Sequence, residues 1–166
     1  PEGSRGCLFI SMKGQGSRMR LIENSTEKMI SVTEITDPAM ASFCESVEPT
    51  STSHSQAARI AAILGVKTSP IRIDSQCKYG IVARSDASIY LRLPKKSGYE
   101  EKVWDHAAGW LIVKEAGGEV TDIHGHPIDF STGRTLSHNI GIVATNGKLH
   151  SQVLSAVRQV LEAAEP

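Results

Sequence analysis

The apolar residues of this chain fall into two patterns, short runs bounded by turn residues and longer segments with helical spacing. The short runs predict strands. They lie at residues 7–12, 17–22, 29–32, 42–46, 71–73, 87–93, 119–121 and 140–144, and the first of them is predicted to be a buried strand. Segments with apolar residues on one helical face predict helices. These segments are residues 56–64, 76–84, 104–116 and 149–163.

Turn residues set the boundaries between these elements. Residues 13–16, Lys-Gly-Gln-Gly, separate the first two runs and predict a β-hairpin. The same glycines could be taken for a phosphate-binding loop, but no helix follows them, so the hairpin is preferred. Gly65 is expected to end the helix before it, and Asp74 and Ser75 are expected to cap the next helix.

The order of the elements indicates the fold class. Strands and helices alternate through most of the sequence, with antiparallel pairing expected near its beginning. This alternation is typical of an α/β domain in which a mixed β-sheet is flanked by helices. The 166 residues are enough for one domain with its own core.

Composition and charge exclude several classes of partner. The 18 basic and 18 acidic residues cancel and form no long run of one sign, so we expect no nucleic-acid polymer as a partner. No apolar run approaches the roughly 18 residues that span a bilayer, so we expect no membrane partner. A pocket for a small anion remains compatible with this composition, because it needs few cations.

The three cysteines bear on the cellular compartment, and the first residues bear on whether the sequence is part of a longer protein. Cys7, Cys44 and Cys77 are far apart and lack zinc-ligand spacing, which favours reduced thiols in a cytoplasmic protein, with a nuclear one also possible. Residues 1–6 contain no signal-peptide pattern and no initiator Met, and they run almost directly into a predicted strand. We therefore expect the sequence to be part of a longer protein.

Asp105 is the first candidate for chemistry, and two interpretations of it stay open. In the first turn of a predicted helix, it could interact with free backbone N–H groups and the helix dipole. It could instead bind a hard cation such as Mg²⁺ while the helix end faces an anion. The small residues that follow it, at 107–109, would leave room for a ligand to approach.

The surrounding segment resembles a known signature. Residues 104–109, Trp-Asp-His-Ala-Ala-Gly, are followed by Glu-Ala-Gly-Gly at 115–118. The pair resembles the second signature of the lithium-sensitive phosphatase superfamily, which includes inositol monophosphatases, inositol polyphosphate 1-phosphatases and 3'(2'),5'-bisphosphate nucleotidases. The resemblance implies that Asp105 ligates a catalytic metal and helps to place the substrate. It also implies inhibition by lithium.

Within this superfamily the chain looks most like the fungal and plant 3'(2'),5'-bisphosphate nucleotidases. Residues 74–79, Asp-Ser-Gln-Cys-Lys-Tyr, are similar to a segment of that group, and the similarity continues at residues 90–94, 101–106, 127–130 and 133–136. The resemblance implies that Ser75, Lys78 and Arg92 contact the nucleotide and its phosphates. It also implies that His54 lines the adenosine side.

The residues themselves leave other roles open. Lys78 could be an ordinary solvated lysine, and Arg92 could be a strand arginine that pairs with a carboxylate. His54 could simply be exposed at the start of its helix. His106, next to Asp105, is expected to be structural or to support the site from behind.

The family's other metal-binding motifs are not found in these residues. Neither Gly-Asp-x-x-Glu nor Asp-Pro-Ile/Leu-Asp-Gly-Thr occurs. The resemblance therefore implies that residues 1–166 form a single carboxy-terminal domain of a longer phosphatase whose amino-terminal domain is absent. Because a two-metal phosphatase needs several converging carboxylates, we expect the isolated chain to bind Mg²⁺ weakly and to hydrolyse little or nothing.

The sequence thus predicts part of a Mg²⁺-dependent phosphatase. Its expected substrate is adenosine 3',5'-bisphosphate, which loses the 3'-phosphate to give AMP; 3'-phosphoadenosine 5'-phosphosulfate is a second candidate. Its expected protein partner is the amino-terminal half of the same enzyme. The alternatives are an inositol phosphate phosphatase of the same superfamily and a stand-alone binding or antigenic domain without catalysis.

Overall fold

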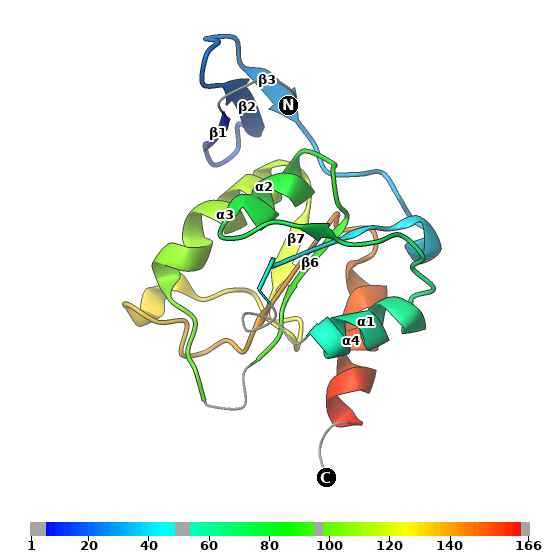
Figure 1. Cartoon of the computed structure of the whole chain (residues 1–166). Helices are drawn as coiled ribbons and strands as arrows, with labels where there is room; N and C mark the ends of the chain where they lie inside the picture. The colour runs from blue at the N-terminus through cyan, green and yellow to red at the C-terminus, as the bar shows by residue number, and fades with distance from the viewer. Residues whose placement is uncertain (1–5, 49–53, 95–97, 164–166) are drawn as a thin grey trace.

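The computed structural model describes residues 6–48, 54–94 and 98–163. Within them, a five-stranded sheet lies between two pairs of helices, and a three-stranded sheet lies beyond one of these pairs (Figure 1). The predicted α/β class, a mixed sheet flanked by helices, is confirmed. No helix in the described ranges has both the length and the apolar character needed to cross a membrane.

The small sheet contains the predicted hairpin. Its strands β1 (Cys7–Ser11), β2 (Ser17–Leu21) and β3 (Lys28–Ile30) pair antiparallel in that order. The prediction that the first strand is buried is wrong. Leu8 is 42% exposed because only one side of β1 packs on the helices below, where Phe9 meets α2 (Cys77–Ala83) at Gly80.

The hairpin turn explains why its glycines are not a phosphate loop. The backbone N–H groups of Gly14 and Gly16 each donate a hydrogen bond of 2.9 Å to the carboxylate of Glu115. The anion that this turn binds is therefore a side chain of its own chain. Glu115, part of the Glu-Ala-Gly-Gly segment, fastens the small sheet to the end of α3 (Val103–Glu115).

The large sheet is mixed. Its order is β5 (Ile71–Arg72), β4 (Phe43–Glu45), β6 (Ile89–Arg92), β8 (Ile142–Thr145) and β7 (Glu119–Thr121). Strand β4 runs parallel to β5 and β6, whereas β8 runs antiparallel to β6 and β7. The carboxyl ends of β4 and β6 therefore lie at the same edge of the sheet.

Helices cover both faces of this sheet (Figure 1). Helices α2 and α3 cover one face, and α1 (His54–Ile63) and α4 (His150–Glu162) cover the other. Two short 3-10 helices, η1 (Pro38–Met40) and η2 (Phe130–Thr132), begin after capping aspartates at 37 and 129.

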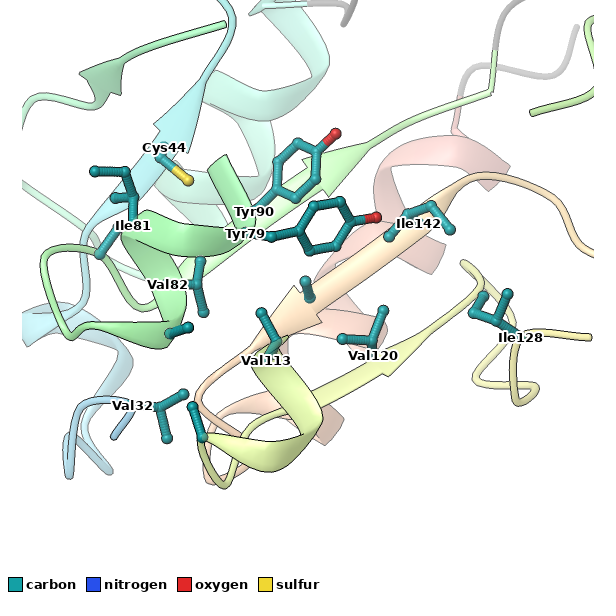
Figure 2. Packing of buried hydrophobic residues seen from close by; sticks show 14 of the residues in the cluster. Val32, Cys44, Tyr79, Ile81, Val82, Tyr90, Val113, Val120, Ile128 and Ile142 are labelled. Atoms are coloured by element: carbon teal, nitrogen blue, oxygen red, sulfur yellow. The ribbon is translucent and has the colours of Figure 1, made fainter. Parts of the chain in front are cut away.

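Alternation along β6 divides its side chains between these faces. Ile89 and Leu91 pack in the core beneath α1 and α4, whereas Tyr90 packs beneath α2 and α3. Figure 2 shows Tyr90 beside Tyr79 of α2 in this second core, where their ring centroids are 5.0 Å apart. Because successive strand residues point to opposite faces, Arg92 belongs on the α2–α3 side with Tyr90.

Helices α2 and α3 pack closely against each other at Gly109. A Cβ atom at this position would lie 2.2 Å from Cδ2 of Tyr79, so only glycine fits without a shift. The room expected at Gly109 for a ligand is thus occupied by Tyr79. Gln76 joins the helices further, because its amide donates to the carbonyl of Trp104 at 2.9 Å and accepts from the N–H of Gly109 at 3.1 Å.

The start of α2 differs from the prediction that Asp74 and Ser75 cap it. The residue before the helix is Gln76, and its side chain makes no capping hydrogen bond. Asp74 instead accepts a hydrogen bond of 3.0 Å from the N–H of Val47, beyond the end of β4. Ser75 has a φ of +60°, in the left-handed region, and its hydroxyl only approaches the N–H of Cys77 at 3.5 Å. The chain thus turns sharply here, which directs Asp74 toward β4.

Candidate active site

A pocket of about 580 Å³ lies on the α2–α3 side of the large sheet. It is placed where the carboxyl ends of β4 and β6 meet the beginnings of α2 and α3, a common position for ligand sites in α/β sheets. Four predicted site residues, far apart in the sequence, line it together: Ser75, Lys78, Arg92 and Asp105. The other lining residues are Ser46, Glu48, Asp74, Gln76, Tyr90 and His106.

Lys78 is a buried cation held by neutral groups. Its residue is 4% exposed, and its Nζ donates to Ser46 Oγ at 3.0 Å and approaches the carbonyl of Ile73 at 3.5 Å. The ammonium also lies 5.4 Å from the centre of the Tyr90 ring. Burial lowers the pKa of Lys78, although the charge of Asp74 opposes this effect. The alternative of a solvated lysine is therefore wrong.

The electrostatics of Lys78 favour an anionic ligand. No carboxylate in the described part of the chain forms a salt bridge with its ammonium. A desolvated charge with only neutral partners carries a cost that an anion in the pocket would relieve.

Arg92 combines two of the interpretations left open by the sequence. It lines the pocket, and its Nε donates a hydrogen bond of 2.8 Å to Oε1 of Glu101. Burial alone would lower the pKa of Arg92, but the hydrogen bond and the charge of Glu101 outweigh burial and raise it. The expected pairing with a carboxylate is present, and it leaves the guanidinium at the pocket wall.

Behind Arg92, Glu101 joins a buried chain of hydrogen bonds. Its second oxygen lies 3.0 Å from Nε2 of His106, whose Nδ1 lies 2.7 Å from the hydroxyl of Tyr79. Burial would raise the pKa of Glu101, but the hydrogen bonds from His106 and Arg92 lower it on balance. Burial also holds the pKa of Tyr79 well above its usual value. His106 therefore supports the site from behind, as expected, and also reaches the pocket wall.

Asp105 lies in the first turn of α3 with its side chain exposed to the pocket. Among the residues that the structure describes, none donates a hydrogen bond to its carboxylate. The role of satisfying N–H groups at the helix start is thus not realised, and the carboxylate is available to a ligand.

The described residues do not by themselves form a metal site. No group of three or more His, Cys, Asp or Glu side chains in these ranges is arranged to hold a metal ion. Asp105 offers one carboxylate, which is too few ligands for a hard cation such as Mg²⁺. A metal step in the chemistry cannot be built from these residues alone.

The structure describes the side chain of Ser75 but not that of His54. Ser75 is exposed at the edge of the pocket, close to the start of α2. His54 is the first residue of α1, but its side chain lies outside the described residues. Its place beside adenosine stays a prediction.

Several residues in or behind the pocket were not predicted from the sequence. Ser46 and Tyr90 looked like ordinary strand residues, and only the parallel pairing of β4 with β6 brings them to Lys78. Glu101 lies four positions before Asp105, in a segment shared with the nucleotidases, and this was a usable signal. Its contact with Arg92 depends on tertiary structure, which no local pattern reveals.

Comparison with known proteins agrees with the fold and the sequence signature. Residues 4–162, nearly the whole chain, match the model of the inositol monophosphatase family. The chain belongs to the inositol monophosphatase family. Proteins of this family are generally metal-dependent.

Two curated relatives are highly similar to the chain in sequence. The chain is 48% identical over 160 residues to a 3'(2'),5'-bisphosphate nucleotidase of Emericella nidulans, covering 95% of this chain and 46% of the relative. It is 47% identical over 157 residues to a protein of the same name from Oryza sativa, covering 95% and 44%. The chain thus spans about half the length of the curated relatives that it matches. The resemblance to the nucleotidases is confirmed.

Solved structures show the same fold. An inositol monophosphatase from Anabaena superposes with a TM-score of 0.66 at 23% identity, covering 95% of this chain and 59% of that one. SuhB from Mycobacterium tuberculosis gives a TM-score of 0.66 at 19% identity, covering 93% and 55%. At these identities the likeness supports the fold alone.

Proposed function

We propose that this chain is the nucleotide-binding part of a 3'(2'),5'-bisphosphate nucleotidase, which removes the 3'-phosphate of adenosine 3',5'-bisphosphate to give AMP. The observation that carries the proposal is the pocket in which Lys78 and Arg92 face the same space as the unpaired carboxylate of Asp105. The names of the curated relatives support the nucleotide as the substrate. The sulfated nucleotide remains a second candidate substrate.

The two cations suit a phosphate for complementary reasons. Lys78 is a point charge partly stripped of water, and Arg92 offers a planar fork of donors. Phosphate oxygens can accept from both while Ser75 contributes a hydroxyl at the edge. These groups bind and orient the anion, and His54 is proposed to line its adenosine side.

Asp105 has the opposite role in this proposal. Its carboxylate would repel a phosphate unless a cation lay between them, which favours a metal ion at this side of the pocket. We propose Mg²⁺, bound by Asp105 together with ligands that the described residues do not supply. The amino-terminal half of the same protein is the proposed source of those ligands, with residues 1–166 as the carboxy-terminal domain. The proposed setting is the cytoplasm.

An inositol phosphate phosphatase is the second candidate. It is favoured by one observation, the match of residues 4–162 to the inositol monophosphatase family. That match is to the family as a whole, whereas the relatives at 47% and 48% identity are named as nucleotidases. The nucleotide is therefore the preferred substrate.

A substrate panel tests the proposal. Phosphate release is measured for the complete encoded protein and for the 166-residue chain, with adenosine 3',5'-bisphosphate and inositol 1-phosphate, in Mg²⁺ and in EDTA. We expect the complete protein to prefer the nucleotide and to need Mg²⁺, and the chain alone to release little phosphate. Preference for the inositol substrate would reject the nucleotide, and rapid turnover by the chain alone would reject the need for further ligands.

A further inference from the structure

Glu101 is a buried acid outside the pocket that contacts the pocket through two neighbours. Its residue is 6% exposed, and both carboxylate oxygens are used, one by Arg92 at 2.8 Å and the other by His106 at 3.0 Å. A carboxylate is costly to bury and is retained only where its partners compensate. Both partners of Glu101 line the pocket.

The contact with Arg92 leaves part of that side chain available. Glu101 accepts from Nε, the inner nitrogen of the guanidinium. The two terminal nitrogens of Arg92 have no hydrogen-bond acceptor within residues 6–48, 54–94 and 98–163. Glu101 thus restrains the plane of the guanidinium while leaving its outer donors unused.

The backbone of Glu101 is itself held firmly. Its carbonyl accepts a hydrogen bond of 2.8 Å from the N–H of Leu136, and the next residue, Lys102, pairs with Thr135 as an antiparallel bridge. The N–H of Val103 then donates to the carbonyl of Arg134 at 3.1 Å. The acid therefore has a fixed point from which to orient Arg92.

The other oxygen of Glu101 extends this restraint to both helices of the site. His106 lies on α3 next to Asp105, and its Nδ1 meets the hydroxyl of Tyr79 at 2.7 Å. Tyr79 follows Lys78 on α2. One carboxylate thereby connects the strand that carries Arg92 with the helices that carry Asp105 and Lys78.

We infer that Glu101 is a positioning residue that holds Arg92 in the orientation in which its outer nitrogens bind a substrate phosphate. The inference rests on the proposed function, because it takes Arg92 as a phosphate ligand. Its physical basis is entropy. A free arginine must give up its rotamer freedom when it binds, whereas one already fixed by Glu101 gives up little.

Two substitutions separate positioning from charge. Glu101→Ala removes the acceptor, whereas Glu101→Gln keeps the size and one acceptor oxygen but removes the charge. We expect AMP affinity, measured by isothermal titration of the 166-residue chain, to fall about tenfold in Glu101→Ala and to be largely restored in Glu101→Gln. Glu119→Ala, which removes the partner of Lys114 at 2.8 Å, serves as the matched control with unchanged affinity.

A double-mutant cycle shows whether Glu101 acts through Arg92. In an Arg92→Ala background, the further change Glu101→Ala should have no effect on AMP affinity. A full additional loss would mean that Glu101 only supports the fold, and tighter binding in both Glu101 variants would mean that it only neutralises Arg92. Either result would overturn the inference.

Two further outcomes separate this inference from the proposed function. If Arg92→Ala weakens AMP binding but Glu101→Ala does not, positioning is rejected and the proposed function stands. If the unmodified chain binds no AMP, both are rejected.

A ligand-free measurement covers the case in which Glu101→Ala does not fold. In the unmodified chain, the Nε–H signal of Arg92 should be slow to exchange with water by nuclear magnetic resonance, and it should remain so in Glu101→Gln. Rapid exchange of this proton in the unmodified chain would contradict the proposed restraint.

Discussion

Among single residues, the hydrogen-bond partners of a buried polar group show whether it serves the pocket or the fold. Among the described residues, Lys78 is hydrogen-bonded to neutral groups only, and it faces the pocket. His150 is also buried, but both of its ring nitrogens are used. Its Nε2 lies 2.9 Å from Thr121 Oγ1 and its Nδ1 lies 3.0 Å from Thr145 Oγ1. His150 therefore connects two strands of the fold and does not serve the pocket.

His150 leads to a prediction about pH and stability. Burial lowers the pKa of His150, while Glu119 opposes and Lys114 adds to this shift. The folded state therefore keeps His150 neutral at pH values where the unfolded chain takes up a proton. Its contribution is complete above the ordinary pKa of about 6.5 and declines as pH falls from there toward the lowered folded pKa.

Urea unfolding at several pH values between 5 and 7.5 checks this prediction. The free energy of unfolding of the unmodified chain should fall with acid more steeply than that of His150→Gln, by at most about 1.4 kcal/mol per pH unit. Gln152→Ala, at an exposed position of the same helix, should keep the slope of the unmodified chain because it removes no titratable group. Equal slopes for the unmodified chain and His150→Gln would contradict the account.

At the scale of elements, the packing of α2 on α3 places the cation and the carboxylate of the site in one pocket. Gly109 permits Tyr79 to approach, and Gln76, just before α2, bonds to Trp104 and Gly109 of α3. The signature glycine thus acts on the site through helix packing and does not leave space for a ligand.

Gly109→Ala should disturb both stability and binding. The added methyl would lie 2.2 Å from Tyr79 Cδ2, so the helices must move apart. We expect a loss of about 1–3 kcal/mol in the free energy of unfolding, which overpacking typically costs. The measurement is chemical denaturation, with Ala108→Ser at an exposed position of the same helix as a control that changes stability by less than about 0.5 kcal/mol. A stability equal to that of the unmodified chain would show that the helices are not held at this distance.

The elements were largely predictable because their apolar patterns are strong. The hairpin, the mixed sheet and helices α1, α3 and α4 agree with the predicted segments within a few residues. Helix α2 was also predicted within one residue at each end, but the capping role of Asp74 was wrong, since Asp74 accepts from the N–H of Val47, a contact across 27 residues. Local capping preferences cannot anticipate such a competitor.

In the whole molecule, the site could likewise be predicted only in part from the sequence. The superfamily signature indicated Asp105, the resemblance to the nucleotidases indicated Ser75, Lys78 and Arg92, and the fold brings all four to one pocket. The sequence could not show that Lys78 is desolvated or that Glu101 restrains Arg92, because burial and long-range pairing arise only in the folded chain.

The share of its relatives that this chain spans also limits the chemistry that it can support. It spans 46% of one nucleotidase relative and 44% of another, and its described residues offer too few carboxylates in one place for a metal site. The binding of an anion in the pocket can therefore be tested on this chain separately from hydrolysis.

One calorimetric titration shows whether Lys78 and its neighbours bind the phosphate of an adenosine nucleotide. The 166-residue chain and its Lys78→Met and Lys114→Met variants are titrated with AMP and with inositol 1-phosphate. Lys114 pairs with Glu119 at the far end of α3 and so provides the matched control.

We expect AMP to bind the unmodified chain more tightly than inositol 1-phosphate does. Lys78→Met should weaken AMP binding at least about tenfold, the value of one charged hydrogen bond, and Lys114→Met should leave it unchanged. AMP affinity that is the same with and without the Lys78 ammonium, or a preference for the inositol phosphate, would contradict the account.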